Sequence, residues 1–417
     1  MTQPSPSLST ARPAAVAFVL VTIALDVIAM GLIIPVLPKL VESLSGGDTA
    51  NAARVFGAFG IVWALMQFFF SPVLGSLSDR FGRRPVILLS NLGLGLDYVL
   101  CALAPDLAWL FVGRVISGIC AATFSTASAY IADVTPPAQR AEKFGLVGAA
   151  FGVGFVLGPA LGGLLGSADP RLPFWVAATL SLTNAAYGYF VLPESLPRQR
   201  RAGFSWAKAN PVGALTLLRS NSQLRGLAAV LFLFHIAHAA LPAVFVLYAG
   251  YRYGWTERDV GISLALVGVC SAVVQGGLIK PVIARIGERA ALLVGLAFGI
   301  AGFLIYGFAT TGWMLLLGIP VATLWGLASS ALQAMMSRLV DPSAQGRLQG
   351  ANSSLMGIGS LIAPGLFTQS FAWAIAGVPA SAARIPGAPF LLGAGLLGIA
   401  LVVAWRVTAE RAAVEPS

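Results

Sequence analysis

The chain has 417 residues, of which 57% are hydrophobic and 10% are charged, and its mean hydropathy is +0.84. A soluble domain carries about a quarter charged residues and could not cover its surface with so few charges. This composition excludes a soluble enzyme and a disordered chain. The net charge of +10 comes mostly from arginines in short loops, which favours orientation signals and contacts with anionic lipid over nucleic-acid binding.

Twelve apolar runs of about 18–24 residues follow one another, each long enough to cross a bilayer core of about 30 Å. They predict an all-α integral membrane protein. We place the spans near residues 14–36, 55–76, 86–104, 109–131, 144–166, 173–192, 226–249, 260–282, 290–310, 313–336, 348–371 and 389–405. The first span lacks a small-residue cleavage site, so we expect a retained helix rather than a removed signal peptide.

Basic residues are distributed unevenly between the two sides of the membrane. Loops on the side of the termini hold 19 Lys and Arg, the opposite loops hold six, and Arg114 lies inside a span. The positive-inside rule therefore predicts that both termini of this multi-pass protein are cytoplasmic.

A long polar interval divides six spans from six. The predicted organisation is a first bundle at residues 1–192, a cytoplasmic loop at 193–225, a second bundle at 226–405 and a cytoplasmic tail at 406–417. Residues 210–224 are modestly amphipathic, which fits either a helix on the inner membrane face or a simple linker.

A shift of 205 residues brings the two bundles into register. It places Arg80, Gly82 and Arg84 on Arg285, Gly287 and Arg289, and it places Pro137, Gly145, Gly152, Gly154 and Pro159 on Pro342, Gly350, Gly357, Gly359 and Pro364. Shared Gly and Pro indicate shared backbone geometry. Two pseudo-symmetric six-helix bundles around a central site are the architecture of alternating-access transporters.

Charged residues inside the first bundle have no counterpart in the second. Asp26, Asp97 and Arg114 fall on Leu231, Gly302 and Ile319. A charge near the bilayer centre costs about 2.5–3.5 kcal/mol, and the second bundle does without it, so we expect these three residues to serve function. The alternative is a set of buried ion pairs that only hold helices together.

Two histidines in the seventh span, His235 and His238, are three residues apart and share a helix face. At a rise of about 1.5 Å per residue, they and the three charged residues lie about 14–21 Å from the inner ends of their spans. The five side chains therefore predict a midplane site that binds and releases protons, although the histidines are equally consistent with satisfied core residues. Neither they nor Cys101, Cys120 and Cys270 have metal-ligand spacing, so we expect no metal.

Two glycine-rich motifs lie in the first half of the chain. The first, between the second and third spans, combines glycines for a tight cytoplasmic turn with charges that can exchange salt bridges as the inner face opens and closes: Gly75, Asp79, Arg80, Gly82, Arg83 and Arg84. The second, in the fifth span, sets small residues four apart around a proline, which permits close helix packing: Gly154, Gly158, Pro159, Gly162 and Gly163.

At these motifs the sequence resembles the major facilitator superfamily, in particular its twelve-helix drug:proton antiporters, and the fifth-span motif is typical of exporters. The region from Leu25 to Pro38 and the segments around Gln67, Asp97, Arg114 and Asp133 are similar to tetracycline-efflux transporters. The resemblance implies proton-coupled efflux of a hydrophobic, drug-like compound, with the tetracycline class favoured. It also implies a monomer in the lipid bilayer.

The resemblance assigns roles to individual residues. It implies proton coupling and drug binding by Asp26 and Asp97, with Arg114 as their partner and Gln67 lining the cavity. Asp79, Arg80 and Arg83 would gate the cytoplasmic side. The energy source would be the proton gradient, without a cofactor, and magnesium would arrive only with a tetracycline substrate.

The sequence departs from the tetracycline exporters in the second bundle. Their essential ninth-helix Asp is Gly299 here, their eighth-helix His is Ser271, and His235 and His238 are candidates to supply the missing titratable group. Two rival functions stay open, a proton symporter that imports a small metabolite and a non-transporting membrane receptor or scaffold. We find no catalytic constellation and no phosphate-binding loop, so we expect neither an enzyme nor an ATP-driven pump.

Overall fold

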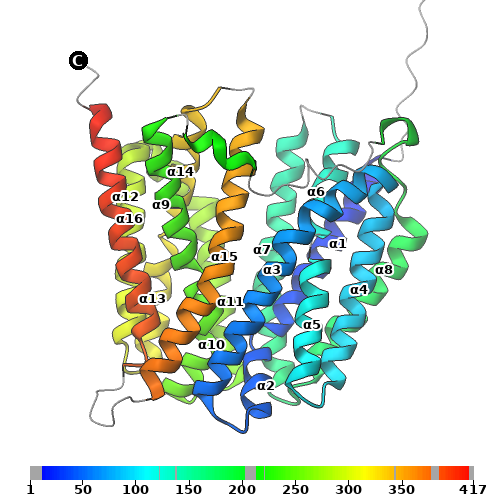
Figure 1. Ribbon diagram of the computed structural model, residues 1–417, viewed down its shortest axis with the longest axis horizontal. Coiled ribbons are helices and arrows are strands. Elements are labelled where there is room, and N and C mark those ends of the chain that lie inside the picture. Colours follow the sequence, from blue (N-terminus) through cyan, green and yellow to red (C-terminus); the bar gives the residue numbers. More distant parts are fainter. Residues whose placement is uncertain are drawn as a thin grey trace, which may run out of the picture.

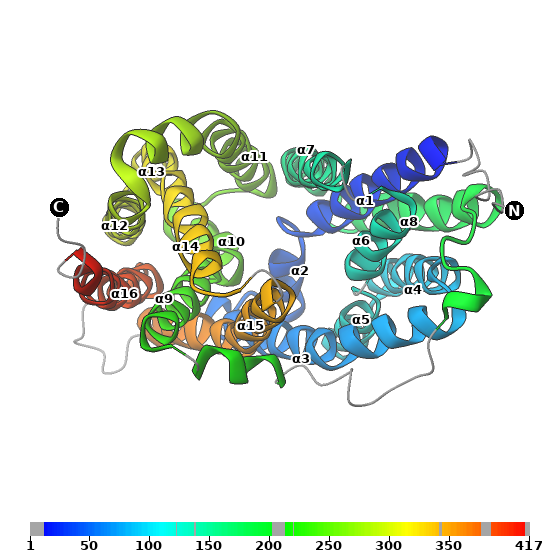
Figure 2. The same ribbon diagram turned by 90° about the horizontal axis from the view of Figure 1, so that it is seen from above.

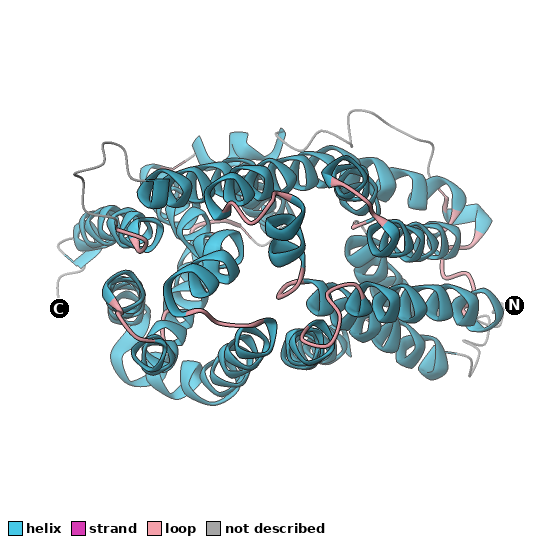
Figure 3. Ribbon diagram, turned by 90° about the horizontal axis from the view of Figure 1, so that it is seen from below, coloured by secondary structure: helices cyan, strands magenta, loops and turns pink. Residues whose placement is uncertain are grey.

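The protein is helical throughout the part of the chain that the computed structural model describes. These residues are 12–121, 123–136, 139–201, 213–219, 221–341, 344–376 and 385–412, and none of them forms a strand (Figure 3). The first half contains α1 (Arg12–Ile33), α2 (Leu37–Leu44), α3 (Thr49–Phe81), α4 (Arg83–Leu103), α5 (Leu107–Cys120), α6 (Thr123–Val134), α7 (Arg140–Gly166) and α8 (Leu172–Val191). The second half contains α9 (Ser222–His238), α10 (Ala240–Tyr253), α11 (Glu257–Val273), η4 (Val274–Leu278), α12 (Ile279–Phe308), α13 (Gly312–Thr323), α14 (Gly326–Arg338), α15 (Gln345–Ala376) and α16 (Ala388–Ala412).

These helices make the twelve expected crossings. Among the described residues, nine stretches are long and apolar enough to span a membrane. One of them, Glu257–Phe308, crosses twice because its backbone turns at Gly287. The pair of α5 and α6 and the helix α8 complete the twelve. The fold class predicted from the hydropathy pattern is confirmed.

Short polar side chains define where several crossings begin. Asp48, Asp106 and Asn221 accept hydrogen bonds from the first backbone N–H groups of α3, α5 and α9, and Thr256 forms a capping box with Asp259 at the start of α11. These caps satisfy N–H groups that have no partner within the helix. The apolar helices are therefore terminated by polar loops.

The internal repeat is visible in backbone conformation. Gly82 and Gly287, related by the 205-residue shift, both have positive φ, at 110° and 79°. Pro159 and Pro364 lie inside the equivalent helices α7 and α15. Helices also break at equivalent places, because α1 ends at Ile33 and α9 ends at His238. The paired Pro137 and Pro342 lie outside the described residues.

The two halves stand side by side, with α1–α8 forming one bundle and α9–α16 the other (Figures 1 and 2). Across the boundary α3 packs against α15 and α7 packs against α11. We call the face where α1 begins and α16 ends the terminal face. The contact between Gly163 and Gly261 lies at the opposite end of the boundary, near the end of α7 and the start of α11.

The central loop is described only in part. Residues 202–212 lie outside the described residues, so the predicted amphipathic stretch 210–224 is only partly tested. Its described portion forms a short 3-10 helix, η3 (Gly213–Arg219), that packs on α9 and α15 with Leu217 and Leu218 buried. Its apolar side thus faces the protein.

Candidate functional site: buried charges and a terminal-face network

Asp97 and Arg114 form an ion pair inside the first bundle. Asp97 on α4 is completely buried, and its Oδ2 lies 3.8 Å from a terminal nitrogen of Arg114 on α5. The Cys101 thiol, one turn further along α4, donates to Asp97 Oδ1 over 3.6 Å. A Cβ on the neighbouring Gly113 would lie 2.6 Å from that carboxylate, so the absence of a side chain there makes room for the pair.

Asp26 has a different partner from the one implied by the family resemblance. On α1 it is half-buried, and its Oδ1 accepts a hydrogen bond of 3.2 Å from the Asn184 side chain on α8. The Thr22 hydroxyl in turn donates to Asn184 Oδ1 over 3.1 Å. The described contacts therefore pair Arg114 with Asp97 and pair Asp26 with an amide.

Asn184 is not among the residues predicted from the sequence. It is the one amide side chain in the predicted span 173–192, and the last span of the second half, 389–405, has no Asn or Gln. Comparing the two halves for amides as well as for charges would have found it.

The two histidines lie at the break between α9 and α10, beside aromatic side chains. His238, the last residue of α9, is exposed, and its ring centre lies 5.4 Å from that of Trp325. Trp325 lies at the break between α13 and α14 and packs against Phe234 at 4.5 Å. His235 is half-buried and lies close to Gly359 on α15. Only His238 is therefore strongly exposed.

Gly299 is packed against the same tryptophan. A Cβ at Gly299 would lie 2.9 Å from both Trp325 Cγ and Leu397 Cδ1. Any larger side chain would have to displace these neighbours. A buried tryptophan thus packs against the position where the resemblance would place an acid. Ser271 on α11 and Gln67 on α3 are half-buried.

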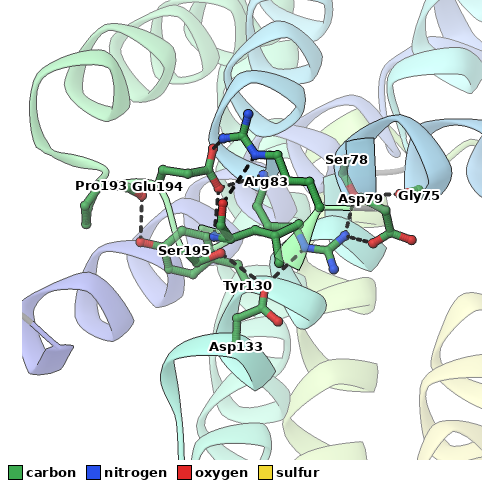
Figure 4. A network of polar contacts seen from close by, with 11 residues as sticks. Gly75, Ser78, Asp79, Arg83, Tyr130, Asp133, Pro193, Glu194 and Ser195 are labelled. Atoms are coloured by element: carbon green, nitrogen blue, oxygen red, sulfur yellow. Dashed lines mark hydrogen bonds and ion pairs between the residues drawn. The ribbon is translucent and has the colours of Figure 1, made fainter. Parts of the chain in front are cut away.

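The charged motif after the second crossing forms a network at the terminal face (Figure 4). Arg83 pairs with Asp79 at 2.6 Å and with Asp133 of α6 at 3.2 Å. Its backbone N–H donates to the Glu194 side chain over 2.8 Å. The network joins α3, α4, α6 and the start of the central loop. The predicted tight turn is a single residue, Gly82, whereas Gly75 and Asp79 lie within α3.

The other two arginines of this motif make separate contacts. Arg84 donates to the backbone carbonyl of Tyr189, and its guanidinium lies 5.7 Å from the centre of the tyrosine ring. Arg80 lies 5.1 Å from the ring centre of its neighbour Phe81. Arg84 therefore attaches the start of α4 to α8, while Arg80 stays within its own turn.

The glycines of the fifth-span motif pack as expected against α1. Added Cβ atoms at Gly154, Gly158 and Gly162 would lie within 2.9 Å of atoms of Val27, Gly31 and Leu32. Gly163 faces the other bundle instead, where a Cβ would lie 2.9 Å from Gly261 Cα. Pro159 contributes to both contacts, with its ring beside Gly31 and its carbonyl beside Gly261. One motif therefore builds a helix pair within the first half and also its junction with the second half.

Comparisons with known proteins agree with this architecture. Residues 19–364 match the model of the Major Facilitator Superfamily. The chain is 38% identical to the class C tetracycline resistance protein of Escherichia coli, over 94% of this chain and 97% of that protein. It is 37% identical to the class B protein of the same species, over 84% and 86% of the two chains.

Solved structures share the fold. The human organic anion transporter MFSD10 is 25% identical, with a TM-score of 0.68 over 96% of this chain and all of that one. A bacterial homologue of the human lysosomal transporter Spinster, described as inward-facing and unoccupied, has a TM-score of 0.71 at 18% identity, over 97% of this chain and 96% of that one.

Proposed function

We propose that this chain, which belongs to the Major Facilitator Superfamily, exports a tetracycline-class compound across the bacterial inner membrane in exchange for protons. The observation that carries the proposal is the pair of carboxylates within the membrane-spanning helices, Asp26 and Asp97, in a chain 38% identical to a tetracycline resistance protein. Buried acids are costly, and the second half of the same fold has none at the equivalent positions.

Asp26 is the proton-coupling group in this proposal. Its carboxylate has no cationic neighbour among its described contacts, so gain or loss of a proton changes the net charge at that point of the membrane. A proton taken up from the outside would favour the drug-releasing state, and its loss to the cytoplasm would reset the carrier. Only a ligand with different affinities for the two states can shift such an equilibrium.

Asp97 and Arg114 serve as a neutral pair that positions drug and proton near the midplane. Arg114 stabilises the Asp97 charge, which would otherwise be isolated in a low-dielectric environment. Gln67 would line the same cavity and add a polar contact. An apolar pocket with few polar groups is typical of sites for drug-like molecules.

The second bundle contributes the exposed His238 and the half-buried His235 to the drug site. Phe234 and Trp325, each 5% exposed, pack behind these histidines and hold their rings in place. Magnesium would enter only as part of a chelated tetracycline, and the protein itself would need no resident cofactor.

The terminal face lies in the cytoplasm in this proposal, following the distribution of basic residues. The described conformation would then be inward-facing, with the Gly163–Gly261 contact closing the outer side. Asp79, Arg80, Arg83 and Arg84 would hold or release the cytoplasmic ends of the helices during the cycle. A monomer suffices, since both halves of the site come from one chain.

Energised inside-out vesicles with a pH-sensitive dye test this proposal. Added tetracycline should release protons from wild-type vesicles, whereas Asp26→Asn should still bind the drug yet fail to accumulate it against a gradient. Undiminished active transport by Asp26→Asn would refute the assignment. Uptake of a polar metabolite with protons would favour the importer, and full function without any buried charge would favour a receptor.

A further inference from the structure

We propose that Asn184, held in place by Thr22, positions the Asp26 carboxylate and hydrogen-bonds it in both of its protonation states. Asn184 is thus a positioning residue for proton coupling on α8. This inference rests on the proposed role of Asp26 and adds two residues to it.

Hydrogen bonds to Thr22 and Asp26 hold the Asn184 amide from two sides. Asn184 and Thr22 are each 1% exposed. The Thr22 hydroxyl donates to Asn184 Oδ1 over 3.1 Å, and Asn184 Nδ2 donates to Asp26 Oδ1 over 3.2 Å and to the Thr22 carbonyl over 3.4 Å. Thr22 lies one helical turn before Asp26 on α1, so one face of α1 provides both the support and the carboxylate.

The direction of the amide follows from chemistry. A charged carboxylate only accepts hydrogen bonds, so the NH2 group of Asn184 must face it. Thr22 then directs its hydroxyl hydrogen to the amide oxygen. Each group satisfies the next, and the buried amide is not left with unmade hydrogen bonds, which would be costly.

The same three residues can also accommodate the protonated acid. When Asp26 binds a proton at Oδ1, its O–H becomes a donor and needs an acceptor. A half-turn of the Asn184 amide presents Oδ1 to that O–H, and the Thr22 hydroxyl then accepts from Nδ2, because a hydroxyl both donates and accepts. The amide then gives up its longer hydrogen bond to the Thr22 carbonyl, and the only covalent change is the one proton on Asp26.

The fold itself does not require this polar group. The 205-residue shift places Thr22 and Asp26 on Leu227 and Leu231. The last crossing of the second half, α16, contains no Asn or Gln that could match Asn184. The second half therefore has neither the acid nor these two supporting groups.

Few other titratable groups on the described helices packed against α1 lie near Asp26. Tyr98 of α4, 6% exposed, lies within electrostatic range of the Asp26 carboxylate. The helices packed against α1 carry Tyr130 and Asp133 on α6, Arg140, Glu142 and Lys143 on α7, and Tyr187 and Tyr189 on α8. Tyr130 bonds to the Pro193 carbonyl, Asp133 pairs with Arg83, Tyr187 packs on Phe18, and the α7 charges lie in its first turn.

The test compares drug-driven proton exchange as a function of pH in vesicles that carry wild type, Asn184→Leu, Thr22→Val or Thr22→Ser. Ser181→Ala is the matched control, because Ser181 is also buried on α8 and its hydroxyl has no hydrogen-bond partner among the described residues. Magnesium tetracycline is the probe. Asn184→Leu and Thr22→Val should move the pH of half-maximal exchange by about one unit towards higher pH. The charge-assisted hydrogen bond to the carboxylate is stronger than the bond to the neutral acid, so its loss favours the protonated form. The KM for drug should change less than about twofold, because the drug-binding groups are intact.

Rescue by the conservative variant separates positioning from mere packing. Thr22→Ser keeps the hydroxyl, so its pH of half-maximal exchange should lie within a few tenths of a unit of the wild-type value. Ser181→Ala should leave that pH unchanged. Wild-type profiles in both Asn184→Leu and Thr22→Val, with Asp26→Asn inactive, would overturn this inference alone. Absence of drug-driven proton flux in the wild type would instead overturn the proposed function. If Asn184→Leu does not insert into the membrane, the smaller Thr22→Val change decides.

Discussion

Arg83 and Glu288 occupy equivalent positions in the two halves and carry opposite charges. Arg83 pairs with Asp133 at 3.2 Å, and Glu288 pairs with Arg338 at 2.6 Å. The 205-residue shift relates both members of one pair to both members of the other. The repeat thus conserves an ion pair at this corner of each bundle while reversing its polarity.

This relationship predicts that the first-half pair tolerates reversal. Arg83→Glu alone should lower drug transport about tenfold or more, because it places three carboxylates together. The double variant Arg83→Glu/Asp133→Arg should recover part of the loss, since it restores the ion pair in the order that the second half uses. Recovery stays incomplete because Asp79, which falls on Ala284 in the second half, still faces a carboxylate. Transport rates normalised to membrane abundance measure this. A double variant no better than the single one would contradict the prediction.

The buried pair of Asp97 and Arg114 should show strong coupling in stability. Arg114→Met leaves a fully buried carboxylate without its cation and should cost about 3–5 kcal/mol. Adding Asp97→Asn removes that charge and should restore most of the loss in thermal stability in detergent, while transport stays abolished. Recovery of transport by the double variant would show that the pair only holds helices together.

Gly158 should tolerate no side chain, because its neighbour across α1 is backbone. A Cβ there would lie 2.7 Å from Gly31 Cα, so Gly158→Ala should destabilise the α1–α7 packing by about 1–3 kcal/mol. Gly152→Ala on the same helix is the matched control, because a Cβ at Gly152 has no neighbour within 4 Å. Thermal unfolding in detergent compares the two, and equal melting temperatures would refute the packing argument.

Gly163 should instead affect the balance of conformations. Its Cβ would press on Gly261 in the other half, so Gly163→Ala disfavours the described state. A cost of about 1.4 kcal/mol would shift the population about tenfold towards the alternative state. Labelling of a cysteine introduced near the terminal face should become correspondingly slower, and an unchanged labelling rate would contradict this expectation.

His238 and His235 should matter for transport if they replace the missing acid of the second half. The double variant His235→Ala/His238→Ala should reduce coupled transport about tenfold or more while membrane abundance is preserved. The single variant at His238 should account for most of the loss, because His238 is the exposed member of the pair. Normal transport by the double variant would rule out the compensation.

Several features of the site could be read from the chain. The apolar runs predict the twelve crossings, and the 205-residue repeat predicts the shared turns at Gly82 and Gly287. The lone charges of the first half identify Asp26, Asp97 and Arg114 as candidates. The fold could be predicted because hydrocarbon penalises exposed backbone groups wherever they occur. The same penalty on isolated charges is the reason these three residues are proposed for function.

The partners of those charges could not be read from the chain. Asp26 and Asn184 are 158 positions apart, and Arg114 faces Asp97 and not Asp26 only because of how α4, α5 and α8 rotate about their axes. Likewise, Gly162 packs on α1 while the adjacent Gly163 packs on the other half. The hydropathy of a segment depends only on the residues of that segment, so membrane spans can be predicted from local sequence. Which side chains meet depends on helix rotation and packing, which only the tertiary structure decides.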